Sequence, residues 1–77
     1  MTDTLADALP REIARVSAKR DRLRDLMKEH PQLTLGMSLT IRIMQAEIDQ
    51  AIRAYANDDI VEMLTSFASL KDYSDDD

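Results

Sequence analysis

The stretch L-P-R-E-I-A-R-V-S-A-K-R-D-R-L-R-D-L-M-K-E-H, residues 9–30, decides the fold. One set of positions recurs along it with alternating spacings of four and three residues: Leu9, Ile13, Val16, Arg20, Leu23, Met27 and His30. This alternation keeps the side chains on one face of an α-helix and matches the heptad spacing of helices that pack lengthwise. The stretch therefore predicts a long helix that packs along a second one.

A second segment repeats the same spacing after a break that contains Pro31 and Gly36. Its repeating positions are Met37, Ile41, Met44, Ile48, Ala51 and Tyr55. The residue before a proline is pushed out of the helical region, and glycine adopts turn conformations that other residues avoid. We therefore expect two antiparallel helices, over about residues 8–30 and 36–56, that form a hairpin.

A third, short helix is predicted over about residues 60–70. Asp59 and Glu62 have the spacing of a capping box before an apolar run. That run contains Ile60, Val61, Met63, Leu64, Phe67, Ala68 and Leu70. So short a helix is unstable alone, so we expect its apolar surface to pack on the hairpin. The expected fold class is all-α, an antiparallel helical hairpin with a short third helix packed on it, which makes a small three-helix bundle.

Both ends of the chain are expected to lie outside this helical domain of residues 8–71. Residues 1–7 are interpreted as a flexible arm, because a helix capped by Thr4 would place Pro10 in its interior. A helix capped by Asp7 leaves Pro10 in the first turn, where its missing N–H has no intrahelical partner to lose. Residues 72–77 are interpreted as a disordered acidic tail.

Composition limits the possible functions. The 77 residues contain no Cys, one Gly and one His, which removes disulfides, thiolate metal sites and glycine-rich phosphate loops. His30 stands alone beside Pro31, and the Asp58, Asp59 and Glu62 group lacks the spacing of a calcium loop, so helix capping explains it. We expect a non-enzymatic protein with no catalytic residues, no cofactor and no metal site.

No targeting or membrane signal is present in the sequence. The first residues carry Asp3 and Asp7 where a signal peptide has basic residues, and no apolar run approaches the roughly 20 residues of a membrane span. The expected location is the cytoplasm, without membrane contact.

Charge is divided unevenly along a chain whose net charge is −5. The first predicted helix has a basic face: Arg11, Arg15, Lys19 and Arg22. This face either binds nucleic acid or pairs with the acidic remainder of the chain. Internal pairing is favoured, because a net negative chain is repelled by phosphates.

The second predicted helix has a wider apolar arc than one neighbouring helix can cover. Its extra strip consists of Leu39, Ile43 and Ala46. Either the third helix or another protein covers this strip.

Arg20 is the one charged residue of the first ladder. Its side chain either extends to the edge of the seam or meets an acidic group on another helix or chain. Arg20 and the strip together form the candidate partner surface.

The function expected from these features is a helical protein–protein interaction module that binds itself or another helical protein. Self-association through the strip is one mode that the sequence leaves open. Two alternatives remain: a nucleic-acid or nucleoprotein accessory that uses the basic face, and an acidic decoy that inhibits a host protein.

Three segments carry a resemblance: L-P-R-E-I-A-R-V at residues 9–16, G-M-S-L-T-I-R-I-M-Q-A-E-I-D-Q-A at residues 36–51, and A-S-L-K-D-Y at residues 68–73. Together they resemble small uncharacterised helical proteins of phage and prophage gene clusters. The resemblance implies a phage-related setting in the bacterial cytoplasm and implies no particular activity.

Overall fold

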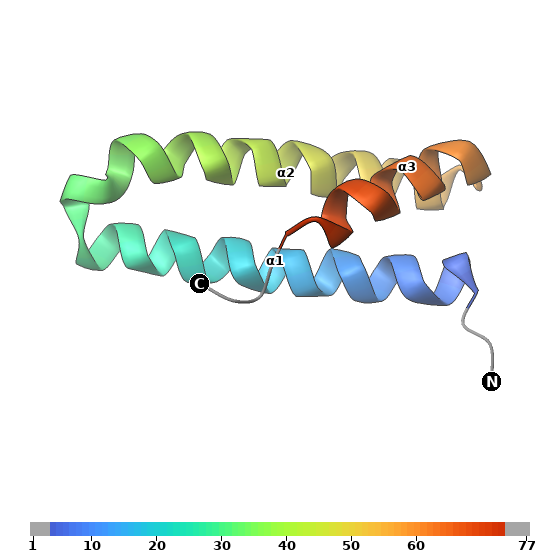
Figure 1. Ribbon diagram of the computed structural model, residues 1–77, viewed down its shortest axis with the longest axis horizontal. Helices are drawn as coiled ribbons and strands as arrows, with labels where there is room; N and C mark the ends of the chain where they lie inside the picture. Colours follow the sequence, from blue (N-terminus) through green and yellow to red (C-terminus); the bar gives the residue numbers. More distant parts are fainter. Residues whose placement is uncertain (1–3, 74–77) are drawn as a thin grey trace.

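The computed structural model describes residues 4–73 and contains three α-helices. They are α1 (Leu5–Glu29), α2 (Thr34–Ala56) and α3 (Ile60–Lys71), with a short 3-10 helix, η1 (Pro31–Leu33), between the first two. α1 and α2 run antiparallel as a hairpin, and α3 lies over the half of that hairpin where α1 begins and α2 ends (Figure 1). Residues 4–73 include no strand, and the predicted all-α three-helix fold is confirmed.

The core lies where all three helices meet. Among the described residues, its buried apolar side chains are Leu9, Val16, Ile41, Met44, Ile48, Ala51, Ala54, Met63 and Leu70. α1 and α2 contribute residues from the two predicted ladders, while α3 contributes Met63 and Leu70. The last position of each ladder is exposed: His30, directly after α1, and Tyr55, on α2. The two ladders therefore face each other as expected, but their burial is confined to one half of the hairpin.

α1 begins at Leu5, before the predicted start at residue 8. Thr4 caps it, because its Oγ1 accepts a hydrogen bond from the backbone N–H of Asp7 at 3.2 Å and donates one to Asp7 Oδ2 at 2.9 Å. Pro10 consequently lies inside the helix. Because proline has no backbone N–H, the hydrogen bond to the Ala6 carbonyl is lost. The Thr4 cap and the burial of Leu9 offset that loss. The predicted arm is thus corrected for residues 4–7, and residues 1–3 lie outside the described part.

The turn between α1 and α2 is made by η1 and not by a glycine. Pro31 begins η1, and the backbone N–H of Leu33 donates to the His30 carbonyl at 2.9 Å. α2 then begins at Thr34, so Gly36 lies within the helix and has no positive φ. A Cβ built on Gly36 would meet no atom within 4 Å. Nothing in the turn therefore requires glycine at this position.

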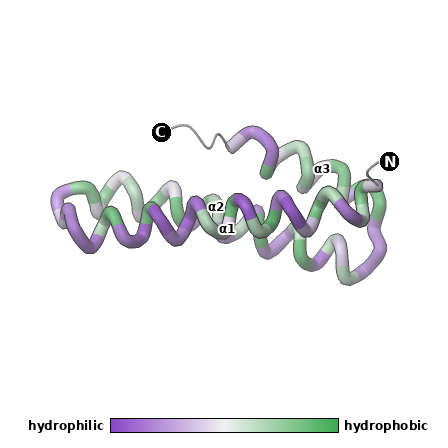
Figure 2. Tube along the Cα trace, turned by 90° about the horizontal axis from the view of Figure 1, so that it is seen from below, coloured by the Kyte–Doolittle hydropathy of each residue, from purple (hydrophilic) through white to green (hydrophobic). Residues whose placement is uncertain are grey.

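α3 begins as the capping box predicts, and its packing differs from the expectation. The Asp59 side chain accepts from the Glu62 N–H at 3.2 Å, after a left-handed residue at Asp58 with φ of 53°. The apolar residues Ile60, Val61 and Leu64 are exposed by 57%, 71% and 55%. Figure 2 shows α3 on one side of the hairpin, where it covers only part of its length. The expected packing of α3 on the hairpin holds for Met63 and Leu70. It does not extend to the three exposed residues, because a helix on the outside of a bundle buries only one of its sides.

The C-terminal segment is ordered further than predicted. The Tyr73 ring packs against the core cluster, and its hydroxyl donates to Glu47 Oε1 at 2.9 Å. The predicted tail of residues 72–77 is thus corrected at Asp72 and Tyr73, because an aromatic ring one turn after Leu70 still reaches α2. Residues 74–77 lie outside the described part.

Candidate protein-interaction surface

The end of the hairpin beyond α3 has no core of its own. We call residues 20–40 the tip, and no side chain within them is buried. α3 has 12 residues and α2 has 23, which correspond to about 18 Å and about 35 Å of helix. A helix of that length covers only half of the hairpin, so the tip is two helices thick (Figure 1).

The tip is nevertheless rich in apolar side chains. They are Leu23, Leu26, Met27, Leu33, Leu35, Met37 and Leu39. Leu35 is 91% exposed, and Leu26 and Leu33 are exposed by 38% and 41%. Single exposed apolar residues are common on protein surfaces, whereas a cluster of them marks a binding surface. The tip is therefore the strongest candidate for a site at which another molecule binds.

One row of apolar side chains runs along the outer side of α2. We call Leu35, Leu39 and Ile43 the ridge. They follow each other at intervals of four residues, which places them in one row on the helix surface, and they are exposed by 91%, 62% and 49%. Ile41, Met44 and Ile48 are buried on the opposite side of α2. The ridge therefore points away from α1.

The structure places the predicted strip residues Leu39, Ile43 and Ala46 together on this surface, all exposed. α3 does not cover them. Sequence analysis missed Leu35, because the segment from Pro31 to Gly36 was assigned to the connection. The signal that would have found it is its position four residues before Leu39, in phase with the strip.

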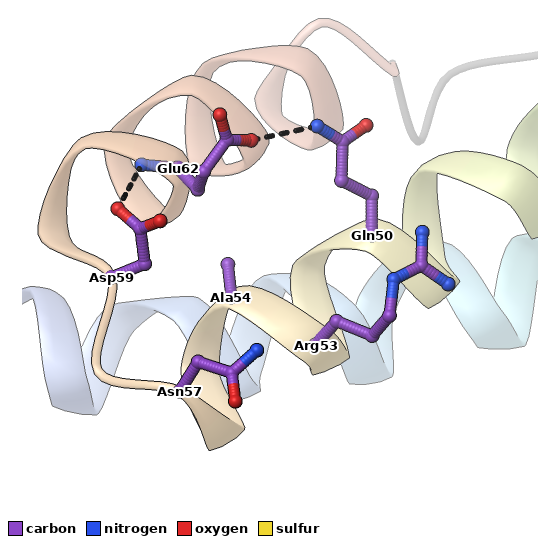
Figure 3. A pocket seen from close by; sticks show the side chains of 6 residues that line it. All are labelled: Gln50, Arg53, Ala54, Asn57, Asp59 and Glu62. Atoms are coloured by element: carbon purple, nitrogen blue, oxygen red, sulfur yellow. Dashed lines mark hydrogen bonds between the residues drawn. The ribbon is translucent and has the colours of Figure 1, made fainter.

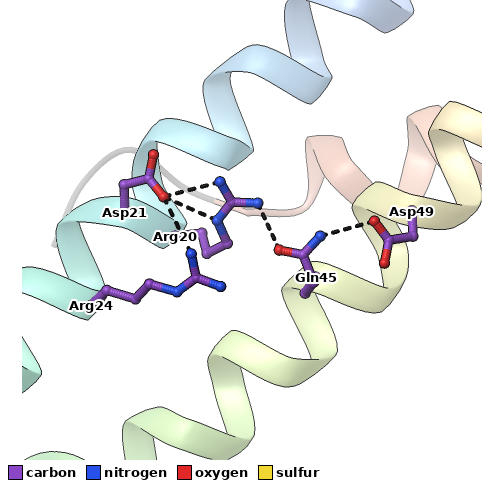
Figure 4. A network of polar contacts seen from close by, with 5 residues as sticks. All are labelled: Arg20, Asp21, Arg24, Gln45 and Asp49. Atoms are coloured by element: carbon purple, nitrogen blue, oxygen red, sulfur yellow. Dashed lines mark hydrogen bonds and ion pairs between the residues drawn. The ribbon is translucent and has the colours of Figure 1, made fainter.

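Arg20 is bonded within the hairpin, away from the ridge. Its Nη1 donates to Gln45 Oε1 at 2.7 Å, and its Nε and Nη2 donate to Asp21 Oδ1 at 3.1 and 3.0 Å (Figure 4). Gln45 Nε2 in turn donates to Asp49 Oδ1 at 2.9 Å. The Arg20 side chain is only 17% exposed. Arg20 thus links α1 to α2 where the tip meets the core, through an amide of α2, while its acidic partner is Asp21 of its own helix.

The four predicted basic-face residues do not form one exposed stripe. Arg15 is half-buried, and its Nη2 donates to the Leu70 carbonyl at 2.9 Å while its Nε pairs with Glu12 Oε2 at 2.7 Å. Lys19 is 8% exposed, whereas Arg11 and Arg22 are exposed. A cation at the last carbonyls of a helix stabilises that helix end. Arg15 therefore stabilises the C-terminal end of α3.

A polar hollow of about 290 Å³ lies between the end of α2 and the start of α3. Its lining residues are Gln50, Arg53, Ala54, Asn57, Asp59 and Glu62 (Figure 3). Gln50 Nε2 donates to Glu62 Oε2 at 2.9 Å, and Asp59 Oδ1 accepts from the Glu62 N–H. These bonds join the two helices and cap α3. The polar groups that they use thus have a structural role.

A second hollow, also of about 290 Å³, lies between α1 and α3. Its lining residues are Ala8, Arg11, Glu12, Arg15, Phe67 and Lys71. Lys71 Nζ lies 5.5 Å from the centre of the Phe67 ring, within the range of a cation–π contact. No group of three or more His, Cys, Asp or Glu residues within 4–73 is arranged to hold a metal ion. Of the helices in that range, none has the length and hydrophobicity needed to cross a membrane.

Comparison with protein-family models, with curated proteins and with solved structures finds no match for this chain. The functional argument therefore rests on the surface itself.

Proposed function

We propose that this protein is a non-enzymatic helical protein–protein interaction module that self-associates through the outer side of α2. The observation that carries this proposal is the tip. Twenty-one consecutive residues, 20–40, bury no side chain although seven of them are Leu or Met. A partner helix on the outer side of α2 would bury Leu35 and Leu39, the two most exposed of these side chains.

The exposed area of the ridge is suited to a weak complex. The exposed fractions of its three side chains together equal about two complete leucine side chains. Full burial of one such side chain contributes about 1.5–3 kcal/mol, so two ridges that pack together contribute about 6–12 kcal/mol. Association costs about 4–15 kcal/mol. The most favourable balance of these terms is about 8 kcal/mol, which corresponds to a dissociation constant no tighter than about 1 µM.

Charge around the ridge also favours an apolar contact. Between Thr34 and Ala46, Arg42 is the only charged residue, and the acids of α2 begin at Glu47. The residues responsible for the net charge of −5 therefore lie outside this surface. An interface without acidic residues does not suit an acidic decoy, and one without a basic cluster does not suit nucleic acid. The phage-related, cytoplasmic setting is part of the proposal and is supported by the sequence resemblance.

Light scattering coupled to size-exclusion chromatography tests the proposal. The mass should exceed the 8.8 kDa of one chain, rise with concentration, and persist between about 0.1 M and about 1 M salt, because salt screens charge contacts and leaves apolar ones. Leu39→Glu should give a monomer. Val61→Glu is the matched control, because Val61 is also an exposed apolar helix residue, on α3.

Two results would contradict the proposal. A wild-type monomer up to about 1 mM would exclude self-association of useful strength. Loss of association in Val61→Glu, with Leu39→Glu unaffected, would place the interface on α3. Circular dichroism of each variant confirms that the helices remain folded.

A further inference from the structure

We infer that the ridge packs on the ridge of a second copy of this chain, antiparallel, about a two-fold axis that passes beside Leu39. This inference rests on the proposed function and specifies the partner and its register. It predicts a closed dimer, because a two-fold contact uses the same surface on both copies and leaves none for a third.

The first argument is the symmetry of the ridge. Leu35 stands four residues before Leu39, and Ile43 stands four residues after it. In an antiparallel pair centred on Leu39, each Leu39 lies beside its equivalent, and each Leu35 lies opposite Ile43 of the second copy. Every large apolar side chain of the ridge then meets another one. Such a self-complementary row suits a second copy of the same chain.

The second argument is Gly36. A glycine within a helix is unfavourable, and neither a positive φ nor a close neighbour in the chain explains it, since a Cβ there would meet no atom within 4 Å. In the proposed dimer, Gly36 lies beside Leu35, where Ile43 of the second copy approaches. The missing side chain leaves room for that isoleucine. The dimer thus provides a reason for a glycine that the single chain does not require.

The third argument is the space along α2. The segment after α3 first bonds α2 at Glu47, through Tyr73. α2 begins at Thr34, so in the antiparallel register centred on Leu39 the first residue of the second α2 lies opposite Met44. The two α2 helices therefore run side by side only over residues 34–44, before the contact of Tyr73 with Glu47.

Disulfide trapping tests the register, because the chain has no cysteine of its own. In Leu39→Cys, the two introduced thiols would lie next to each other across the axis, within the range that a disulfide spans. In the control Ala46→Cys, another exposed position of the same helix, the two thiols of one dimer would be separated by about 20 Å. Under mild oxidation, Leu39→Cys should become a covalent dimer and Ala46→Cys should not.

A filled-glycine variant provides the second measurement. Gly36→Leu should lower the association constant by about tenfold or more, because its side chain would occupy the space of Ile43. Its circular dichroism should show helices that are retained or strengthened, because leucine is a better helix former than glycine.

The outcomes separate this inference from the proposed function. If the wild type associates and Leu39→Glu does not, but Ala46→Cys crosslinks as fast as Leu39→Cys, the interface is correct and the two-fold register is wrong. Unchanged association of Gly36→Leu, or a mass that grows beyond two chains, would also overturn the inference. A wild type that stays monomeric at every concentration overturns both.

Discussion

Ser66 is a core position whose chemistry does not fit its surroundings. Its residue is 4% exposed, and among the described residues its Oγ is the one buried side-chain N or O atom without a hydrogen-bond partner. A buried unsatisfied hydroxyl costs about 1–3 kcal/mol, and alanine is the better helix former. We expect Ser66→Ala to raise the free energy of unfolding by about 1 kcal/mol, measured by chemical denaturation. Ser69→Ala, on a less buried side of α3, should gain only a few tenths. Equal gains in the two variants would contradict the burial argument.

Tyr73 provides a pH-dependent contribution to stability. Burial of its hydroxyl, then its hydrogen bond to Glu47, then the negative charge of that carboxylate raise the pKa of Tyr73 from 10.0 to about 12. The folded chain therefore holds the proton more tightly than the unfolded chain. The contribution is complete below pH 10, the unfolded value, and is lost as the pH rises toward 12.

Tyr73→Phe should accordingly lower the free energy of unfolding by about 0.5–1.5 kcal/mol at neutral pH, the value of one hydrogen bond. Denaturation curves of both proteins between pH 7 and 12 should show this difference narrowing above pH 10. Tyr55→Phe is the control for general loss of a phenol, because Tyr55 is also a tyrosine on the surface, 43% exposed. A difference between wild type and Tyr73→Phe that stays constant to pH 12 would rule out the Glu47 contact as its source.

The start of α1 depends on two opposing local preferences. Thr4 caps the helix through its two hydrogen bonds with Asp7, while Pro10 disfavours a helix that contains it. If α1 begins at Leu5, Pro10→Ala restores a hydrogen bond to Ala6 and should stabilise the protein by about 1–3 kcal/mol. Thr4→Ala should destabilise it by about 1 kcal/mol. Thermal or chemical denaturation measures the stability of both variants. If neither change alters the stability, α1 begins near residue 8 and not at Leu5.

The elements that sequence predicted correctly are those set by nearby residues. The ladders of α1 and α2 and the Asp59 cap of α3 depend on spacings within a few turns, and the strip of Leu39, Ile43 and Ala46 followed from an apolar arc that was too wide. The extent of coverage by α3 was not predictable in this way. Where α3 lies along the hairpin depends on contacts distant in sequence, such as that between Tyr73 and Glu47. For this reason the exposure of Leu64 and the burial of Lys19 emerged only from the structure.

The two halves of the hairpin differ in how many side chains they bury, and we expect them to differ in stability. The buried residues of α1 lie between Leu9 and Lys19, and those of α2 lie between Ile41 and Ala54. Segments with few buried contacts open at a lower free-energy cost than the core. In dilute solution, amide hydrogens of residues 24–40 should therefore exchange faster than those of residues 44–54.

Protein concentration should change this exchange pattern in one place. If two copies pair through the ridge, the complex must dissociate before α2 can open around Leu39, and exchange there should slow as the dimer forms. Hydrogen exchange at about 10 µM and about 1 mM measures the difference. Leu39→Glu should exchange at the same rate at both concentrations, and so should the core of the wild type between residues 44 and 54. Equal slowing of the tip and the core would mean that the dimer stabilises the fold as one unit, so that the two halves do not open separately. Slowing confined to the ridge would show that the second copy covers the apolar row on the outer side of α2.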